Sequence, residues 1–143
     1  MAAKGKLLGE ARAGEELGPM DVTVDRAAAD RFLLRSGYES VFFGPGGAGR
    51  DVVPPGAFGE VYTDMLEAKG YYFLNSIQAR CEEQTLRPVA IAEPLTCVGS
   101  VVDAGITRSG LVFVDIEARV LDAGGVPVFR SQNRLVVTPG ESE

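Results

Sequence analysis

The residues best suited to chemistry lie at the start of a predicted helix. Glu60 and Asp64 are one helical turn apart, so their carboxylates would share one side of that helix and could act in proton transfer. The alternative is that both belong, with Glu67, to a solvated or interface-facing side. Just before them, Gly56–Phe58 would present backbone N–H groups without helical partners, because the first amides of a helix are unpaired.

The sequence contains no histidine, which excludes Ser-His-Asp and Cys-His catalysis, imidazole acids or bases and histidine-based metal sites. Only Cys81 and Cys97 could supply thiols, so we expect neither a metal nor a cofactor. We interpret both as free thiols of the core in a reducing compartment. A disulfide between two neighbouring strands is the alternative.

The helix that positions these residues is predicted within Val53–Tyr72. Its apolar residues come in pairs four positions apart, which places them on one face. Pro54 and Pro55 mark the approach, Lys69 suits the negative end of the helix dipole, and Gly70 suits the left-handed residue that ends a helix. One apolar face must be buried against another element, so we expect a sheet around this helix.

Strand-like segments supply that sheet, and alternation is strictest from Val112 to Val120. A helix is predicted after Thr23 as N-cap, and Gly44–Gly49 predicts a loop. Residues 1–13 are expected to be a loose lead-in. The predicted strands are Glu15–Val22 (interrupted at Gly18-Pro19), Phe73–Leu86, Leu95–Ala104, Leu111–Asp122 and Val126–Thr138.

The late connections are short enough for hairpins, so we predict an antiparallel meander of about five strands. Such a sheet leaves at least one edge strand exposed, which favours pairing with a second subunit. The chain of 143 residues is expected to be a single domain.

The net charge of −6 and the pI near 4.7 argue against nucleic acid or an anionic membrane as partner. No apolar run approaches the roughly 18 residues of a membrane helix. The N-terminus lacks the apolar core of a signal peptide, so we expect a cytoplasmic protein.

In order and spacing, four segments together resemble the MaoC-like dehydratases and hydratases of the hot-dog superfamily. The resemblance implies an α+β hot-dog fold, in which a curved antiparallel sheet wraps around a long central helix. The four segments are GEELGPMDVTVDRAAADRFLLRSG (14–37), VVPPGAF (52–58), LRPVAIAEPLTCVGSVVD (86–103) and LVFVDIEARVLDAGGVPVFRSQNRLVV (111–137).

The resemblance also implies a dimer with an acyl-thioester pocket near the start of the central helix. In the family, an Asp and a His add water reversibly to a trans-2-enoyl thioester of coenzyme A or acyl-carrier protein, and helix-start amides polarise the carbonyl. Alignment on Ser36-Gly37 puts Tyr38 at the Asp position and Phe43 at the His position. The usual pair is therefore absent.

We accordingly expect an acyl-thioester-binding protein that is a degenerate dehydratase or hydratase, or the non-catalytic subunit of one. The alternatives are an active thioesterase or atypical dehydratase using a carboxylate on the central helix, as some hot-dog thioesterases do, and a module that serves assembly only. Glu60 is the candidate catalytic residue; the expected substrate-binding residues are Tyr38, Phe43, Pro55, Gly56, Ala57 and Phe58.

Further candidates are weaker. Glu39 and Asp51 flank the glycine loop and could act as acid or base. Scattered arginines could meet coenzyme A phosphates or simply belong to the solvent face: Arg80, Arg87, Arg108, Arg130 and Arg134. The expected partner is a second hot-dog subunit, in a homodimer or a heterodimer.

Overall fold

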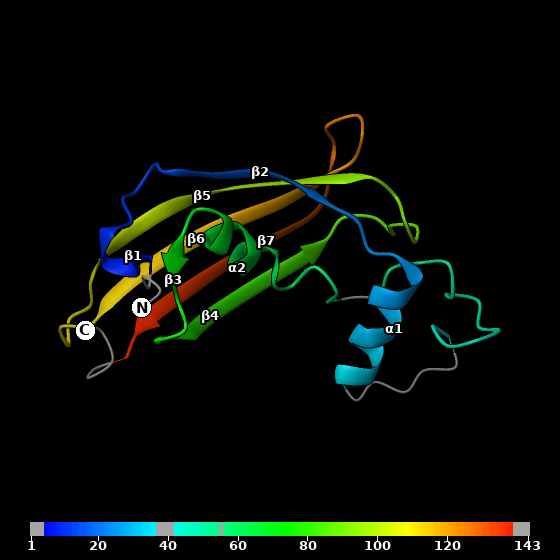
Figure 1. Ribbon diagram of the computed structural model, residues 1–143, viewed down its shortest axis with the longest axis horizontal. Coiled ribbons are helices and arrows are strands. Elements are labelled where there is room, and N and C mark those ends of the chain that lie inside the picture. Colours follow the sequence, from blue (N-terminus) through cyan, green and yellow to red (C-terminus); the bar gives the residue numbers. More distant parts are fainter. Residues whose placement is uncertain (1–4, 37–41, 55, 139–143) are drawn as a thin grey trace.

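The computed structural model describes residues 5–36, 42–54 and 56–138. Its main element is a five-stranded antiparallel sheet in the order β2-β5-β6-β7-β4 (Figure 1). The elements are β1 (Lys6–Leu7), the 3₁₀ turn η1 (Leu8–Glu10), β2 (Glu16–Val22), α1 (Arg26–Arg35), α2 (Val61–Ala68), β3 (Tyr71–Tyr72), β4 (Ser76–Thr85), β5 (Leu95–Ile106), β6 (Val112–Leu121) and β7 (Pro127–Val137).

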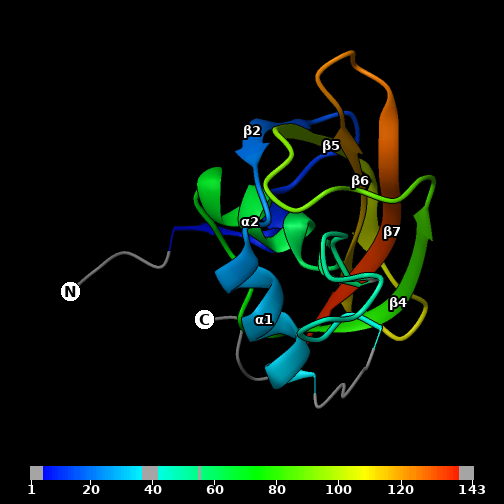
Figure 2. The same cartoon turned by 90° about the vertical axis from the view of Figure 1, so that its right-hand side faces the viewer.

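The sheet curves around α2, with β2 at one edge and β4 at the other (Figure 2). Its inner face follows from the alternation of β6, where Val114, Ile116, Ala118 and Val120 are fully buried. Successive strand residues point to opposite faces, so the intervening residues of β6 lie on the outer face. The predicted arrangement of a curved sheet around a central helix is confirmed.

The helix buries the predicted apolar face: Met65 and Leu66 are fully buried, and Val61 and Tyr62 nearly so. Burial of each such side chain contributes about 1.5–3 kcal/mol. The chain leaves the helix through Gly70, at φ +85°, whose N–H donates to the carbonyl of Glu67 at 2.9 Å. Both features agree with the sequence pattern.

The prediction of a long helix was wrong, because α2 has only 8 residues. Residues 56–60 form turns in front of it. Gly56 has φ +89°, which a right-handed helix cannot contain, and the N–H of Gly59 donates to the carbonyl of Gly56. The glycines therefore delay the start of the helix to Val61.

The N-terminal segment is not a loose lead-in over the part that the structure describes. β1 pairs in parallel with β3, directly after α2, and Leu8 and Ala11 are buried in the core. Leu8 and Ala11 are close enough in sequence for both to enter the core from one short turn. The segment therefore forms a separate two-stranded sheet with β3, at the end of the molecule opposite α1 (Figure 1).

The prediction that β4 and β5 form a hairpin was also wrong, because β4 pairs with β7 at the far edge of the sheet. The connection between them crosses the end of the sheet. Arg87 holds it in place, contacting Glu93 at 2.6 Å and Asp122 of the β6–β7 turn at 3.2 Å. A connection of this length can form a hairpin between neighbouring strands or cross the end of the sheet. The length alone therefore could not decide between these two paths.

The segment before α2 is anchored to α1. The N-cap of α1 is Asp25, which accepts a hydrogen bond from the Ala28 N–H at 2.8 Å, so the prediction of Thr23 as N-cap was wrong. Arg50, at the end of the glycine-rich loop, forms a two-pronged ion pair with Asp30 at 2.7 and 3.1 Å. This pair fixes the predicted loop against the helix.

Candidate functional site

Three hollows meet at the start of α2, where the turns of residues 56–60 lead into the helix. One lies toward β2, one toward α1 and one toward β4; we call them the β2-side groove, the α1-side hollow and the β4-side hollow. Ala57, Val61 and Asp64 line both the groove and the α1-side hollow. Gly56 and Glu60 line both the α1-side and the β4-side hollows. The three spaces therefore surround one short segment.

The β2-side groove has a volume of about 520 Å³, and its lining mixes apolar and polar residues. The apolar part of this lining suits a hydrocarbon chain, which gains free energy when it leaves water. The lining side chains from β2 and the residues after it are Met20, Asp21, Val22, Thr23 and Val24, and those from the α2 region are Ala57, Phe58, Val61, Asp64, Glu67 and Ala68.

The α1-side hollow, of about 260 Å³, combines both charge signs. Arg31 and Arg35 lie one turn apart on α1 and face Glu60 and Asp64 across the space. Phe32 fills the position next to Gly56, since a Cβ there would lie 3.2 Å from the phenyl ring. The hollow can therefore accept polar parts of a ligand.

The β4-side hollow, of about 400 Å³, has polar side chains on the sheet. Gln78 on β4 donates to the Tyr62 hydroxyl at 2.9 Å and to the Asn133 side-chain oxygen at 2.7 Å. Asn133 in turn donates to the Ser131 hydroxyl at 3.3 Å. Asn133 and Ser131 are buried, so a hydrogen-bonded chain runs from this hollow into the inner face of the sheet.

The remaining lining of the β4-side hollow carries two carboxylates, Glu60 and Glu83. Both raise the pKa of Tyr62, whose largest cause of increase is burial of the phenol. Tyr62 therefore stays protonated near neutral pH. Its hydroxyl accepts from Gln78 and donates to no acceptor within the described residues, so its proton is available to a ligand.

Asp64 lines the other two spaces, and its pKa is raised by burial first and then by the charges of Glu60 and Glu67. Glu60 is the N-cap of α2 and makes no capping hydrogen bond with its side chain. Glu60 and Asp64 therefore line the same α1-side hollow, and Glu60 also lines the β4-side hollow.

The predicted amides are only partly as expected. The Ala57 N–H donates to the Pro54 carbonyl at 3.2 Å, so this amide is not unpaired. Phe58 is buried and its ring packs on Phe129 with centroids 5.6 Å apart, which makes it a core residue. By contrast, the amides of Glu60 and Tyr62 donate to no acceptor in the described part of the chain.

Other predicted residues lie elsewhere. Tyr38, Pro55 and Glu39 fall outside the described residues. Phe43 lies in the loop before Arg50, edge to face with Phe42 at 4.9 Å, and lines none of the three hollows. Asp51 pairs with Arg26 at 3.1 Å.

Four of the proposed phosphate-binding arginines are engaged away from α2. Arg134 and Arg80 pair with Asp115 at 2.7 and 3.9 Å, while Arg130 donates to Gln84 at 2.8 Å. Arg87 holds the β4–β5 connection as described above. Arg108 lies in the exposed turn between β5 and β6. The arginines nearest the site are instead Arg31 and Arg35, which the sequence did not single out.

Cys97 is a buried free thiol, as predicted, and its Sγ lies 3.6 Å from the Met65 sulfur. Cys81 is exposed, so its assignment to the core was wrong. The reason is that β4 is an edge strand, so no further strand of the sheet covers Cys81 on its outer edge. Burial raises the pKa of the Cys81 thiol, and so does its hydrogen bond to Glu83 at 3.5 Å.

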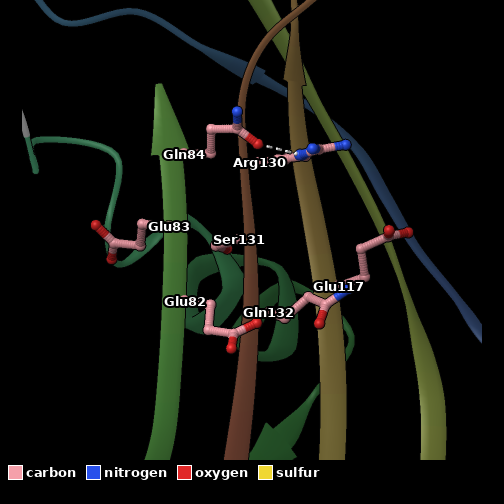
Figure 3. A pocket seen from close by; sticks show the side chains of 7 residues that line it. All are labelled: Glu82, Glu83, Gln84, Glu117, Arg130, Ser131 and Gln132. Atoms are coloured by element: carbon pink, nitrogen blue, oxygen red, sulfur yellow. Dashed lines mark hydrogen bonds between the residues drawn. The ribbon is translucent and has the colours of Figure 1, made fainter. Parts of the chain in front are cut away.

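The outer face of the sheet carries a separate polar hollow of about 460 Å³ over β4, β6 and β7 (Figure 3). Glu82, Gln132 and Glu117 lie on its near side, while α2 lies behind the strands in this view. Its contacts are those of a solvated sheet face. Glu83 lines both this hollow and the β4-side hollow.

Neither a metal site nor a membrane span is found in the ranges that the structure describes. No group of three or more Cys, Asp or Glu side chains there could hold a metal ion. No described helix is both long and apolar enough to cross a bilayer.

No family model and no curated protein matches the sequence. Among solved structures, the chain is similar to the truncated HadBC (3R-hydroxyacyl-ACP dehydratase) complex from Mycobacterium tuberculosis, with TM-score 0.75 and 16% identity, covering 90% of this chain and 99% of that one. It is also similar to a MaoC-like dehydratase from Rhodospirillum rubrum, with TM-score 0.62 and 19% identity over 93% and 97% of the two chains. A third similar structure is a hot-dog-like protein from Thermanaerovibrio acidaminovorans, with TM-score 0.63 and 17% identity over 90% and 84%. At these identities the likeness establishes the fold alone: the chain has the hot-dog fold, as the sequence predicted.

Proposed function

We propose that this chain is a MaoC-like hot-dog protein that binds an acyl thioester of coenzyme A or acyl-carrier protein at the start of α2. The carrying observation is that a groove with apolar lining residues and two hollows with charged lining residues meet at one segment, where the amides of Glu60 and Tyr62 donate to no acceptor among the described residues. The acyl chain fits the β2-side groove. The thioester would lie beside residues 56–62, and the polar arm of the carrier would leave through one of the hollows.

The same site argues against hydration by the family's usual route. The chain has no histidine, and the phenyl ring of Phe43 cannot transfer a proton. We therefore propose a degenerate dehydratase or hydratase, or the non-catalytic subunit of one. The HadBC structure supports a subunit role, since that protein is a dehydratase complex.

The second subunit would pair with β4. One side of β4 is bonded to β7, and the other forms the edge of the sheet with both its faces exposed. If two copies paired antiparallel about Cys81, Arg80 of one copy would lie opposite Glu82 of the other on the outer face. This register is complementary in charge at both ends, which favours a second copy or a related hot-dog subunit.

A thioesterase that uses a central-helix carboxylate is the second candidate. It is favoured by Glu60, whose residue lines two of the three hollows and precedes the first turn of α2. This second candidate would bind the same acyl thioester, but it would hydrolyse the ligand rather than only bind it.

The test is binding of the non-hydrolysable thioether analogue of octanoyl-CoA, measured by titration calorimetry. We expect Ala57→Phe, which fills the groove, to weaken binding at least about tenfold, equivalent to about 1.4 kcal/mol. Ala123→Phe in the exposed β6–β7 turn is the matched control and should bind as the original protein does. Absence of binding, or equal binding by Ala57→Phe, would contradict the proposal.

A further inference from the structure

Glu83 is the carboxylate that sequence reasoning missed. In β4 it pairs with Ser131 of β7, whose buried side chain belongs to the inner face, so Glu83 also faces inward. Its Oε2 would lie only 2.9 Å from a Cβ at residue 59, which means that the carboxylate rests against Gly59 in the turns before α2. Figure 3 shows Glu83 extending from β4 toward that segment, and the residue is also one of those that line the outer-face hollow together with Glu82 and Gln132.

The surroundings of Glu83 leave it able to accept a proton. Cys81, two residues earlier on the same face, donates a weak hydrogen bond at 3.5 Å. Within the described residues, no lysine or arginine forms an ion pair with Glu83. Its carboxylate is therefore neither neutralised by a cation nor saturated with donors.

Hydrogen-bond donors line the same hollow. The amides of Glu60 and Tyr62 have no described acceptor, and the Tyr62 side chain is only 5% exposed while its hydroxyl proton is unused. Donors held in place by a helix start and by packing can stabilise a developing oxyanion without reorganising. A base and oxyanion donors thus surround one space of about 400 Å³.

We propose that Glu83 is a catalytic residue and that the β4-side hollow hydrolyses the thioester bound at the start of α2, an inference that rests on the proposed binding function. Glu83 takes one proton from a water molecule as the water oxygen bonds to the thioester carbonyl carbon. The carbonyl electrons move to its oxygen, which accepts hydrogen bonds from the amides of Glu60 and Tyr62 and from the Tyr62 hydroxyl. When the C=O bond reforms, the C–S bond breaks, and the departing sulfur takes the proton from Glu83. Thioester and water give a carboxylic acid and a free thiol.

The role of Glu83 differs from that of Glu60 in a testable way. Glu60 is at the helix start and Glu83 is on the strand across the hollow, so each can be neutralised separately. Glu117 offers a control, because it is a glutamate on the outer face that belongs to β6 and takes no part in the proposed site or in pairing through β4 (Figure 3).

The experiment measures release of free thiol from octanoyl-CoA by the purified full chain, beside calorimetric binding of the thioether analogue. We expect Glu83→Gln to lower kcat at least about 100-fold, the usual contribution of a positioned general base, while its affinity for the analogue changes less than about twofold. Glu117→Gln should leave both quantities unchanged. Thermal unfolding of each variant shows that the fold is intact.

The two proposals fail differently. If the original protein binds the analogue but releases no thiol, or if Glu83→Gln keeps full activity, the catalytic role of Glu83 is overturned while binding stands. Loss of activity in Glu60→Gln but not in Glu83→Gln would assign the base to Glu60. If the analogue does not bind at all, the proposed function itself is wrong.

Discussion

The two sides of α2 differ in chemistry although one short helix forms both. Toward β2 and β5, Met65 packs on Cys97 and against Gly99 of β5, and apolar side chains such as Met20, Val22 and Val61 line part of the β2-side groove. Toward β4, Tyr62 meets Gln78, and a chain of polar side chains continues to Asn133. The apolar side suits retention of a hydrocarbon chain and the polar side suits reaction with water. This contrast supports an acyl-thioester site in which the acyl chain binds on the apolar side and the reaction with water takes place on the polar side.

The largest effect is expected from emptying the apolar side. Met65 is fully buried, so Met65→Ala should destabilise the protein by about 2–5 kcal/mol through lost burial and a cavity. Urea unfolding measures the change, and Leu34→Ala, at a side chain that is 83% exposed, is the control expected within about 0.5 kcal/mol. If Met65→Ala lowered the free energy of unfolding no more than Leu34→Ala does, α2 would not pack against the sheet as described.

Pairing through β4 is expected to respond to charge reversal. If the second copy binds in the register centred on Cys81, Arg80→Glu would place like charges opposite each other twice and raise the dimer dissociation constant about tenfold. The double variant Arg80→Glu with Glu82→Arg should restore it. Sedimentation equilibrium distinguishes these cases, and failure of the double variant to recover would exclude this register.

Removing one polar group from the other side of α2 should cost less than emptying the apolar side. Tyr62→Phe deletes the hydroxyl that accepts from Gln78, and Gln78 keeps its second acceptor, Asn133. We expect a loss of about 0.5–1.5 kcal/mol in the free energy of unfolding. A loss as large as that of Met65→Ala would erase the contrast between the two sides.

The smallest effect concerns Asp64 and depends on pH. Burial raises its pKa in the folded protein, so the folded state binds the proton more tightly than the unfolded state does. Stability should therefore fall as pH rises from about the ordinary value of 3.8 through the raised folded pKa. Asp64→Asn should remove this fall and stabilise the protein at neutral pH by less than about 1 kcal/mol, with the difference vanishing at low pH. The free energy of unfolding of both proteins is measured at a series of pH values. The same difference between Asp64→Asn and the original protein at every pH would contradict this prediction.

Much of the fold was predictable because its signals are local. The alternation of β6 assigned its inner face correctly, and the apolar pairs of α2 identified the face that meets the sheet. Gly70 was also correctly placed at the helix end. The start of the same helix was placed too early. The spacing of apolar residues does not show that Gly56 has a positive φ, which a right-handed helix cannot contain.

The candidate site was predicted only in part. Glu60 was singled out because the apolar pattern predicted a helix that contains it, whereas the structure makes it the N-cap just before α2. Glu83 was missed because its role depends on which strand β4 pairs with and on the contact with Gly59, more than twenty positions earlier in the chain. The position of Cys81 was misjudged for the same reason: alternation alone cannot tell an inner strand from an edge strand.

By itself, the sequence determined which side chains are available and how each segment alternates. It excluded imidazole chemistry, and it assigned the apolar faces of α2 and β6, since periods of 3.6 and 2 are properties of neighbouring residues. The tertiary structure decided which strand lies at the edge, that residues 5–11 join the core, and that Glu60, Tyr62 and Glu83 share one hollow. Such contacts join segments far apart in the chain, and only long-range packing selects among the pairings that local patterns permit.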